Sequence, residues 1–422
     1  MARFYGAALG RSFAALRVRD YRRWSLVQLL SGTGNAAAQI AIAWQVVQLG
    51  GNGIALGAVT GGMMLPTLLL GPFIGALVDR YARRVVLLIT ATVQSLLLGS
   101  LSALAFSGVL QLWMLIVFAV VHGVAFAADN PARQLLVMDI VGRERLTSAV
   151  SMNEVIINGS RVLGPALAGF LLVATEAAWC FVLGAAVFLP SIIVLVRLQP
   201  MRQTQAVPQR RPEIASGDIA TGERRPWRFV ATTAPVRATL VLAVCAAASY
   251  NIAVVVPLIV ADVFHADGGT YGALAVAFGL GALPGALASA TGPTTPRSSE
   301  VRMLALAMAA TVLLAAAAPT LPLLFVALGS VGAVVMWFIA RANAFVMLTA
   351  PKRIRGRVMG IWAMALPGST VVTGLAVGAL ADFTDPRLAY GVVGVVTGVV
   401  VGLCWRALRA LPETSEPLSA ND

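Results

Sequence analysis

The sequence has few charged residues. Only 12% of its 422 residues are charged and 59% are hydrophobic, whereas about 25% of residues are charged in a typical soluble protein. So apolar a chain cannot cover its folded core with a polar surface, which excludes a soluble enzyme. We expect an integral membrane protein.

Cysteine and lysine are also scarce. The three cysteines lie in apolar runs without paired spacing, so we expect neither a disulfide framework nor a metal site. The single lysine, Lys352, precedes Arg353, and no phosphate-binding glycine loop ends in lysine and serine or threonine. These absences exclude an ATP-driven pump on one chain, and we expect no enzymatic activity and no cofactor. The arginine-rich start leads into a long apolar segment and does not resemble a cleavable signal peptide.

Long apolar runs are abundant instead. A bilayer core of about 30 Å needs about 20 apolar residues in a helix. Twelve segments are candidates for such helices, although the ninth is shorter than the others. They cover residues 24–48, 55–78, 85–106, 112–129, 148–174, 178–196, 238–261, 270–292, 303–318, 321–345, 358–381 and 388–405.

The net charge of +13 is unevenly placed along the chain. With the connections numbered alternately, 28 of the 31 basic residues fall in the termini and the even-numbered loops, and Arg387 is alone in the odd-numbered loops. By the positive-inside rule we expect a multi-pass protein of the cytoplasmic (inner) membrane with both termini in the cytoplasm. The partners of this charge would be anionic lipid headgroups and not nucleic acid.

One long polar connection divides the spans into six and six. Residues 198–237 contain proline, glycine and both signs of charge, which predicts a cytoplasmic linker between halves at 1–197 and 238–422. Gly71 to Leu77 matches Gly281 to Leu287 at an offset of 210. Such a match is expected of parallel repeats in a transporter.

The connection after the second apolar segment carries the sharpest motif, Gly75-Ala-Leu-Val-Asp79-Arg80-Tyr-Ala-Arg83-Arg84. One interpretation is a tight loop with arginines on the cytoplasmic side. The motif also resembles the signature loop of the major facilitator superfamily, with Ala82 in place of a glycine. The resemblance implies a latch in which Asp79 meets the start of the eleventh helix and an arginine pairs with Asp129 at the end of the fourth.

Further motifs resemble the enterobactin-exporter and macrolide-efflux branch of that superfamily over about residues 20–405. The matching stretches begin at Asp129, Leu146, Arg161 and Arg355. Two departures from the drug-antiporter pattern are Ala119 where an arginine is usual and Gly169 preceded by Ala168 where two glycines are usual.

Polar residues inside the fifth apolar segment form one helical face. Glu154, Asn158, Arg161 and Pro165 are spaced four, three and four. Arg161 would lie roughly 18 Å from the helix start at 1.5 Å per residue, where a charge costs about 2.5 kcal/mol or more. We expect Asn158 and Arg161 to meet substrate, with a structural polar contact between helices as the alternative.

Other candidates for a substrate cavity lie on the first, seventh and tenth helices. They are Asn35, Gln39, Tyr250, Asn251, Trp337 and Arg341. The polar face of the first helix either lines a cavity or bonds to neighbouring helices. Arg341 follows Trp337 by one turn, which allows a cation–π contact or a snorkelling arginine.

Two residues are candidates for proton coupling. Glu154 is the carboxylate well inside a span on a polar face, although it also lies near the cytoplasmic boundary. His122 either relays a proton or is a buried structural histidine on an apolar helix.

We therefore predict an all-α, twelve-helix secondary transporter of the major facilitator fold. The resemblance implies export of a small amphipathic compound, such as a siderophore, a macrolide or another drug-like molecule, by proton antiport. Uptake or lipid flipping by the same fold is a second hypothesis, because alternating access has no fixed direction. A membrane sensor or interaction protein without transport is a third.

Overall fold

The computed structural model describes residues 14–142, 145–198, 226–293, 295–351 and 353–409. All regular elements in these ranges are helices, which confirms the all-α prediction. The first half begins with the short helix η1 (Ala14–Arg17). It continues with α2 (Arg19–Gln48), α3 (Gly53–Arg80), α4 (Arg83–Phe106), α5 (Leu112–Val141), α6 (Leu146–Ala174), α7 (Ala177–Ala186) and α8 (Phe188–Arg197).

The second half has more interrupted helices. It contains α9 (Pro226–Thr232), α10 (Ala234–Tyr250), α11 (Ile252–Leu258), the π-helical η3 (Ile259–Val263), α12 (Gly268–Thr291), α13 (Ser298–Ala316), α14 (Leu321–Thr349), α15 (Arg355–Ala363), the π-helical η4 (Met364–Gly368), α16 (Ser369–Phe383) and α17 (Pro386–Leu403). Prolines lie at two of the interruptions, Pro257 in α11 and Pro367 in η4. A proline removes one backbone donor, so such local adjustments of a membrane helix are expected.

Eleven helical segments in the described ranges are long and apolar enough to cross a membrane. The twelfth predicted span is α2, whose hydropathy is lowered by Gln28, Asn35 and Gln39. It nevertheless packs against α6 and α7 inside the bundle. Each of the twelve predicted apolar segments therefore corresponds to a helix or to a helix with a break.

The fourth span differs from the prediction. We expected it to end at Asp129, before Pro131, but α5 continues to Val141. A proline inside a helix removes one backbone hydrogen bond and clashes with the preceding turn, but membrane helices tolerate it because neighbouring groups satisfy the freed backbone. Arg133 pairs with Asp129 one turn away, N to O 2.6 Å, and this contact spans the proline.

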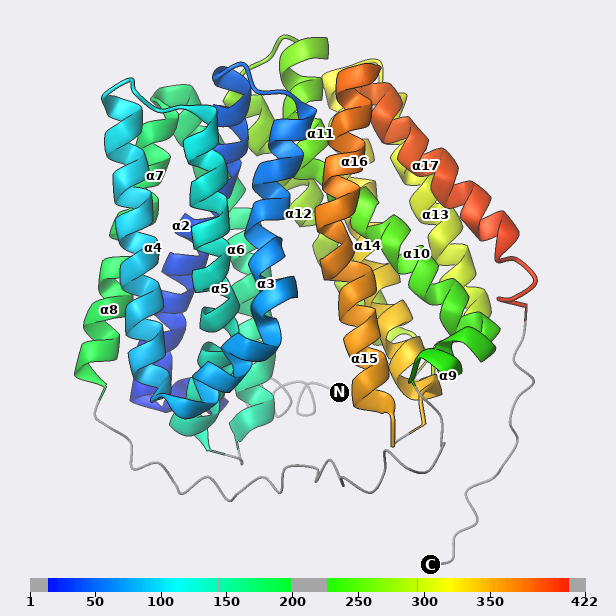
Figure 1. The fold of residues 1–422 in the computed structure, drawn as a ribbon, viewed down its shortest axis with the longest axis horizontal. Coiled ribbons are helices and arrows are strands. Elements are labelled where there is room, and N and C mark those ends of the chain that lie inside the picture. Colours follow the sequence, from blue (N-terminus) through cyan, green and yellow to red (C-terminus); the bar gives the residue numbers. More distant parts are fainter. Residues whose placement is uncertain (1–13, 143–144, 199–225, 294, 352, 410–422) are drawn as a thin grey trace, which may run out of the picture.

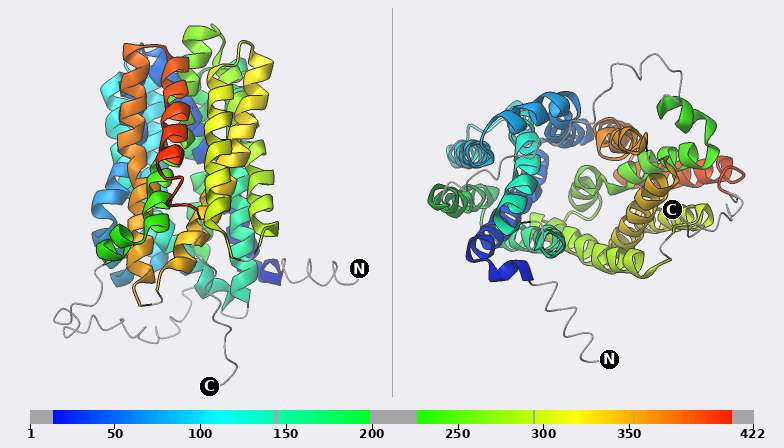
Figure 2. Two further views of the ribbon diagram at one scale, coloured as in Figure 1. Left: turned by 90° about the vertical axis from the view of Figure 1, so that its right-hand side faces the viewer. Right: turned by 90° about the horizontal axis from the view of Figure 1, so that it is seen from below.

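The helices form two groups that lie side by side. Figure 1 shows the helices from α2 to α8 on one side and the helices from α9 to α17 on the other. Seen from below, the two groups surround the middle of the molecule (Figure 2). The strongest contacts between them join α3 to α16 and α6 to α12.

The bundle has two ends, which the helices reach alternately. The end where α8 finishes and α9 begins is called the linker side, and the opposite end is called the far side; they are at the bottom and top of Figure 1. Arg387, at the far side, stacks over Phe264 with its guanidinium carbon 4.8 Å from the ring centre and donates to the carbonyl oxygen of Ala318 at 2.8 Å. Asp267 caps the start of α12 there, and the backbone hydrogen bond from Thr270 lowers its pKa.

Candidate functional site

On the far side, α3 and α16 cross with no room for side chains. A methyl group added to Gly53 would overlap the carbonyl oxygen of Gly378. One turn further, a Cβ on Gly57 would lie 2.7 Å from the carbonyl oxygen of Gly374. Small residues at this spacing let membrane helices approach closely. The two halves are therefore in direct backbone contact at this end.

Glycines also allow α6 and α12 to approach closely. A Cβ on Gly272 would lie 2.7 Å from the backbone nitrogen of Gly169, and one on Gly279 would lie 3.0 Å from the carbonyl oxygen of Arg161. Arg161 is in the middle of α6 (Leu146–Ala174). The backbone of Arg161 therefore lies at the boundary between the two halves.

Toward the linker side these contacts end. A Cβ on Gly368 would still lie 3.0 Å from Leu68 Cδ1 of α3. A Cβ on Gly71, Gly356 or Gly360 would meet no atom within 4 Å. Figure 1 shows the lower parts of α3 and α15 diverging. The halves are closed against each other on the far side and separate toward the linker side.

The arginines of the predicted latch bind within the first half. Arg83 donates from Nη1 to both carboxylate oxygens of Asp139 on α5, at 2.8 and 2.5 Å. Arg84 donates to the carbonyl oxygen of Val196 at 2.6 Å, and Arg80 is exposed. The side chain of Asp79, and the surroundings of Gly75, lie outside what the structure describes.

Asp129 has different partners from those that the resemblance implied. It is buried, accepts from Thr90 Oγ1 at 3.2 Å and binds Arg133 on its own helix. Among the described contacts, Arg83 reaches Asp139 and not Asp129. The extension of α5 beyond residue 129 explains the difference, because it places a second acid closer to the start of α4.

The polar face of α6 is accessible. Glu154 and Arg161 are exposed and Asn158 is half-buried, with its amide donating to the carbonyl oxygen of Glu154 at 2.9 Å. Within the described ranges, neither the Glu154 carboxylate nor the Arg161 guanidinium has an ion-pair partner. Arg161 is thus an accessible cation at mid-helix, beside the boundary between the halves.

The polar residues of α2 become more exposed from Gln28 to Gln39. Gln28 and Ser31 are buried, Asn35 is half-buried and Gln39 is exposed. Ser31 donates to the carbonyl oxygen of Gln28 at 3.3 Å. The accessible members of this face are those that we expected to meet substrate, Asn35 and Gln39.

Tyr250 and Asn251 lie at the break between α10 and α11. Tyr250 packs edge to face on Phe278, with ring centres 5.7 Å apart. The buried Asn251 amide donates to Thr373 Oγ1 at 3.0 Å and to the carbonyl oxygen of Thr370 at 3.3 Å. Asn251 therefore ties the helix break to α16, which is the contact expected of a structural residue.

Arg341 is also engaged in structural contacts. Its Nε and Nη2 donate to the two oxygens of Glu300 at 2.6 and 2.7 Å, and its Nη1 donates to the carbonyl oxygen of Pro293 at 2.7 Å. The cation–π contacts of the described residues do not include a stacking of Arg341 on Trp337, which the spacing in the sequence allows. The two hydrogen bonds to Glu300 hold the guanidinium against that carboxylate instead.

His122 is buried on α5 between two aromatic rings. The rings of Phe118 and Phe126 stack on it with centres 5.7 and 6.4 Å away. Its Nδ1 has no hydrogen-bond partner among the described atoms. A buried ring whose Nδ1 has no hydrogen-bond partner among the described atoms is a poor link in a proton path in this conformation.

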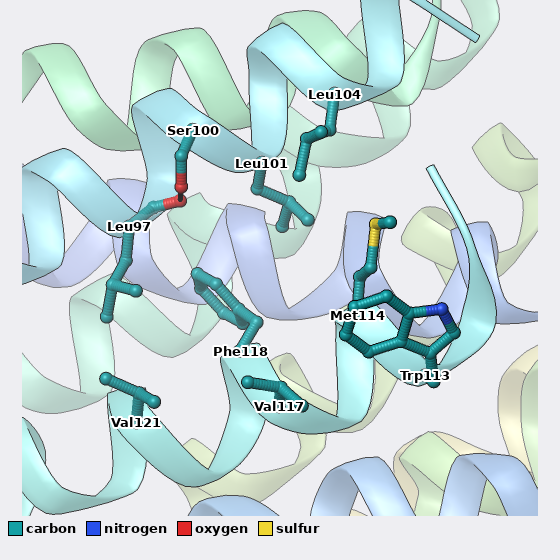
Figure 3. A pocket seen from close by; sticks show the side chains of 9 residues that line it. All are labelled: Leu97, Ser100, Leu101, Leu104, Trp113, Met114, Val117, Phe118 and Val121. Atoms are coloured by element: carbon teal, nitrogen blue, oxygen red, sulfur yellow. Dashed lines mark hydrogen bonds between the residues drawn. The ribbon is translucent and has the colours of Figure 1, made fainter. Parts of the chain in front are cut away.

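A shallow pocket of about 290 Å³ lies away from these residues, between α4 and α5 (Figure 3). Its lining is apolar apart from Ser100, whose hydroxyl donates to the carbonyl oxygen of Leu97. None of the predicted substrate or coupling residues lines it. No group of histidine, cysteine, aspartate and glutamate in the described part of the chain has the geometry of a metal site.

Sequence reasoning gave no weight to three acids that the structure shows in specific contacts. Asp139 and Glu300 bind arginines, and Asp382 binds the start of α3. The sequence pattern that could identify these acids is weak, because an acid near a helix end usually faces water. Only the partner, far away in sequence, gives each one its role.

Nearly the whole chain matches a known protein family. A family model described as transmembrane secretion effector matches residues 10–421. The multidrug efflux pump Tap of Mycolicibacterium fortuitum is 27% identical over 92% of this chain and 96% of its own length. The staphyloferrin A transporter of Staphylococcus aureus is 31% identical over an aligned stretch that covers 39% of this chain and 42% of that relative.

Solved structures share the fold at low sequence identity. The nucleoside transporter NupG aligns with a TM-score of 0.68 at 12% identity, covering 93% of this chain and 100% of that one. A bacterial homologue of the human lysosomal transporter Spinster, in an inward-facing and occupied conformation, aligns with a TM-score of 0.71 at 13% identity, covering 94% and 97%. These likenesses support the fold alone.

Proposed function

Because the chain belongs to the transmembrane secretion effector family of major facilitator transporters, we propose that it exports a small amphipathic compound from the cytoplasm. The observation that carries this proposal is the pairing of an interface closed at one end with the exposed Arg161 beside it. An alternating-access transporter closes its halves at one end while substrate reaches the middle from the other. If the linker side is cytoplasmic, this conformation is open to the cytoplasm.

Arg161 is the proposed substrate contact. Asn158, Asn35 and Gln39 are further polar residues that we propose to contact the substrate. A guanidinium binds carboxylates and other hydrogen-bond acceptors strongly where water is scarce. The described carboxylates do not neutralise Arg161, so a substrate with an acidic or acceptor group is favoured. A carboxylate siderophore or an oxygen-rich macrolide has such groups. The names of two relatives, a staphyloferrin A transporter and macrolide efflux protein A, are consistent with this class.

The test is accumulation of a compound panel in cells without their own efflux pumps. We expect cells that express the protein to retain less of at least one siderophore, macrolide or amphipathic dye. Arg161→Ala should abolish this difference at normal protein levels. Arg145→Ala, an exposed arginine at the start of the same helix, should keep it. Equal accumulation with Arg161→Ala and the parent protein would contradict the assignment of Arg161.

Proton antiport is the proposed energy source, with Glu154 as the carrier. Its carboxylate is exposed and has no ion-pair partner within the described ranges, so protons reach it in this conformation. His122 is the less favoured carrier because it is enclosed by Phe118 and Phe126. An uncoupler added to the accumulation assay should remove export of the identified compound.

A further inference from the structure

Asp382 makes a contact that crosses between the two halves. It lies in the last turn of α16, and its Oδ1 accepts from the backbone nitrogen of Gly53 at 2.5 Å. Its Oδ2 accepts from the backbone nitrogen of Ile54 at 2.9 Å. Both donors are at the start of α3, in the other half.

These bonds complete the start of α3. The first four backbone N–H groups of a helix have no partner within the helix. Here the N–H of Ala55 donates to Asn52 Oδ1 and that of Leu56 donates to the carbonyl oxygen of Asn52. The other two N–H groups depend on Asp382, and a carboxylate at this position also interacts favourably with the helix dipole.

The glycine crossing brings the carboxylate into range. Gly374, Gly378 and Asp382 are four residues apart on α16, so they share one face. On α3, Gly53 and Gly57 lie against the two glycines of that face. The row of direct backbone contacts therefore ends in a charged contact at the far-side surface.

We propose that Asp382 is a latch that holds the two halves together on the far side in the state open at the linker side. Opening the far side must separate Gly53 from Gly378, and this breaks both bonds of Asp382. The latch goes beyond the export function, since uptake would need the same opening.

The chain offers a matched control. Asp385 also caps a helix with its carboxylate, accepting from the backbone nitrogens of Arg387 at 2.7 Å and Leu388 at 3.3 Å. Those donors belong to α17 in the same half. Removing the Asp385 charge changes a helix cap of the same chemistry three residues away without breaking a contact between the halves.

The experiment measures distances in the full chain reconstituted in lipid nanodiscs, with the three native cysteines replaced. One spin-label pair at Ser107 and Thr320 reports the far side, and a second pair at Arg197 and Ser299 reports the linker side; all four residues are exposed. Each pair is measured in the parent protein and in Asp382→Asn, Asp382→Ala and Asp385→Asn.

Asp382→Ala should raise the ratio of far-side-open to far-side-closed molecules about five-fold or more, the lower end of typical coupling between sites. Asp382→Asn should raise it less, because one acceptor oxygen remains, and Asp385→Asn should leave it unchanged. The proposal is overturned if Asp382→Ala gives the parent distribution, or if Asp385→Asn gives an equal shift. No substrate is needed, so failure of the export assay does not affect this result.

Discussion

At the scale of single residues, the charges divide into those that hold the fold and those that remain available. Arg341 and Arg83 are both bound by carboxylates of neighbouring helices. Arg161 is exposed in the middle of a span without such a partner among the described residues. A sequence pattern identifies all three as unusual, but only the positions of Glu300 and Asp139 separate the structural arginines from the available one.

The Arg341–Glu300 pair provides a stability prediction. Arg341 is only 5% exposed, so Glu300→Ala leaves a buried charge without its carboxylate and with only the carbonyl oxygen of Pro293 as acceptor. We expect the free energy of unfolding to fall by about 1–3 kcal/mol, measured as a lower melting temperature in detergent. Asp20→Ala is the control, because its pair with Arg23 is about half exposed on both sides and spans 4.0 Å, and such a pair contributes at most about 1 kcal/mol. Equal effects of the two variants would contradict a structural role for Glu300.

Glu154 provides a coupling prediction. Glu154→Gln removes the proton-binding group but keeps a side chain of the same size, so proton movement driven by substrate in proteoliposomes should be lost. Glu176→Gln, an exposed acid before α7, should behave like the parent protein. Undiminished proton movement in Glu154→Gln would eliminate this residue as the carrier and direct attention to His122.

At the scale of helices, the sequence predicted the spans well and their ends less well. Apolar length alone places eleven of them, since the bilayer sets a minimum that few other segments reach. The remaining predicted span, α2, is a helix of lower hydropathy. The continuation of α5 past Pro131 to Val141 was missed because it depends on tertiary contacts, including Arg83 with Asp139. The break at Asn251 was missed because Pro257 lies further along, in α11, and the break itself depends on contacts with Thr373 on α16.

The crossing of α3 and α16 provides a prediction at this scale. In Gly378→Ala the new methyl group would overlap the carbonyl oxygen of Gly53. Overpacking of this kind costs about 1–3 kcal/mol, so the far-side-closed state should become less populated and transport should fall. Gly402→Ala on α17, where no atom lies within 4 Å of the new Cβ, should be normal in both respects. Normal transport and distances in Gly378→Ala would show that the crossing is not essential to closure.

At the scale of the whole molecule, the direction in which this conformation opens depends on which side of the membrane the linker occupies. The positive-inside pattern predicts that the linker side is cytoplasmic. A cysteine at Thr320, exposed on the far side, should react with a membrane-impermeant reagent in intact cells, and a cysteine at Arg197 should react only after the membrane is opened. The reverse pattern would invert the proposed direction of the open state.

Export driven by protons is tested most directly in inside-out membrane vesicles with an acidic interior. For a compound identified in the accumulation assay, we expect uptake into the lumen that ends when the pH gradient is collapsed and is absent with Arg161→Ala. Accumulation that is unaffected by collapse of the pH gradient, or that occurs only in right-side-out vesicles, would contradict it.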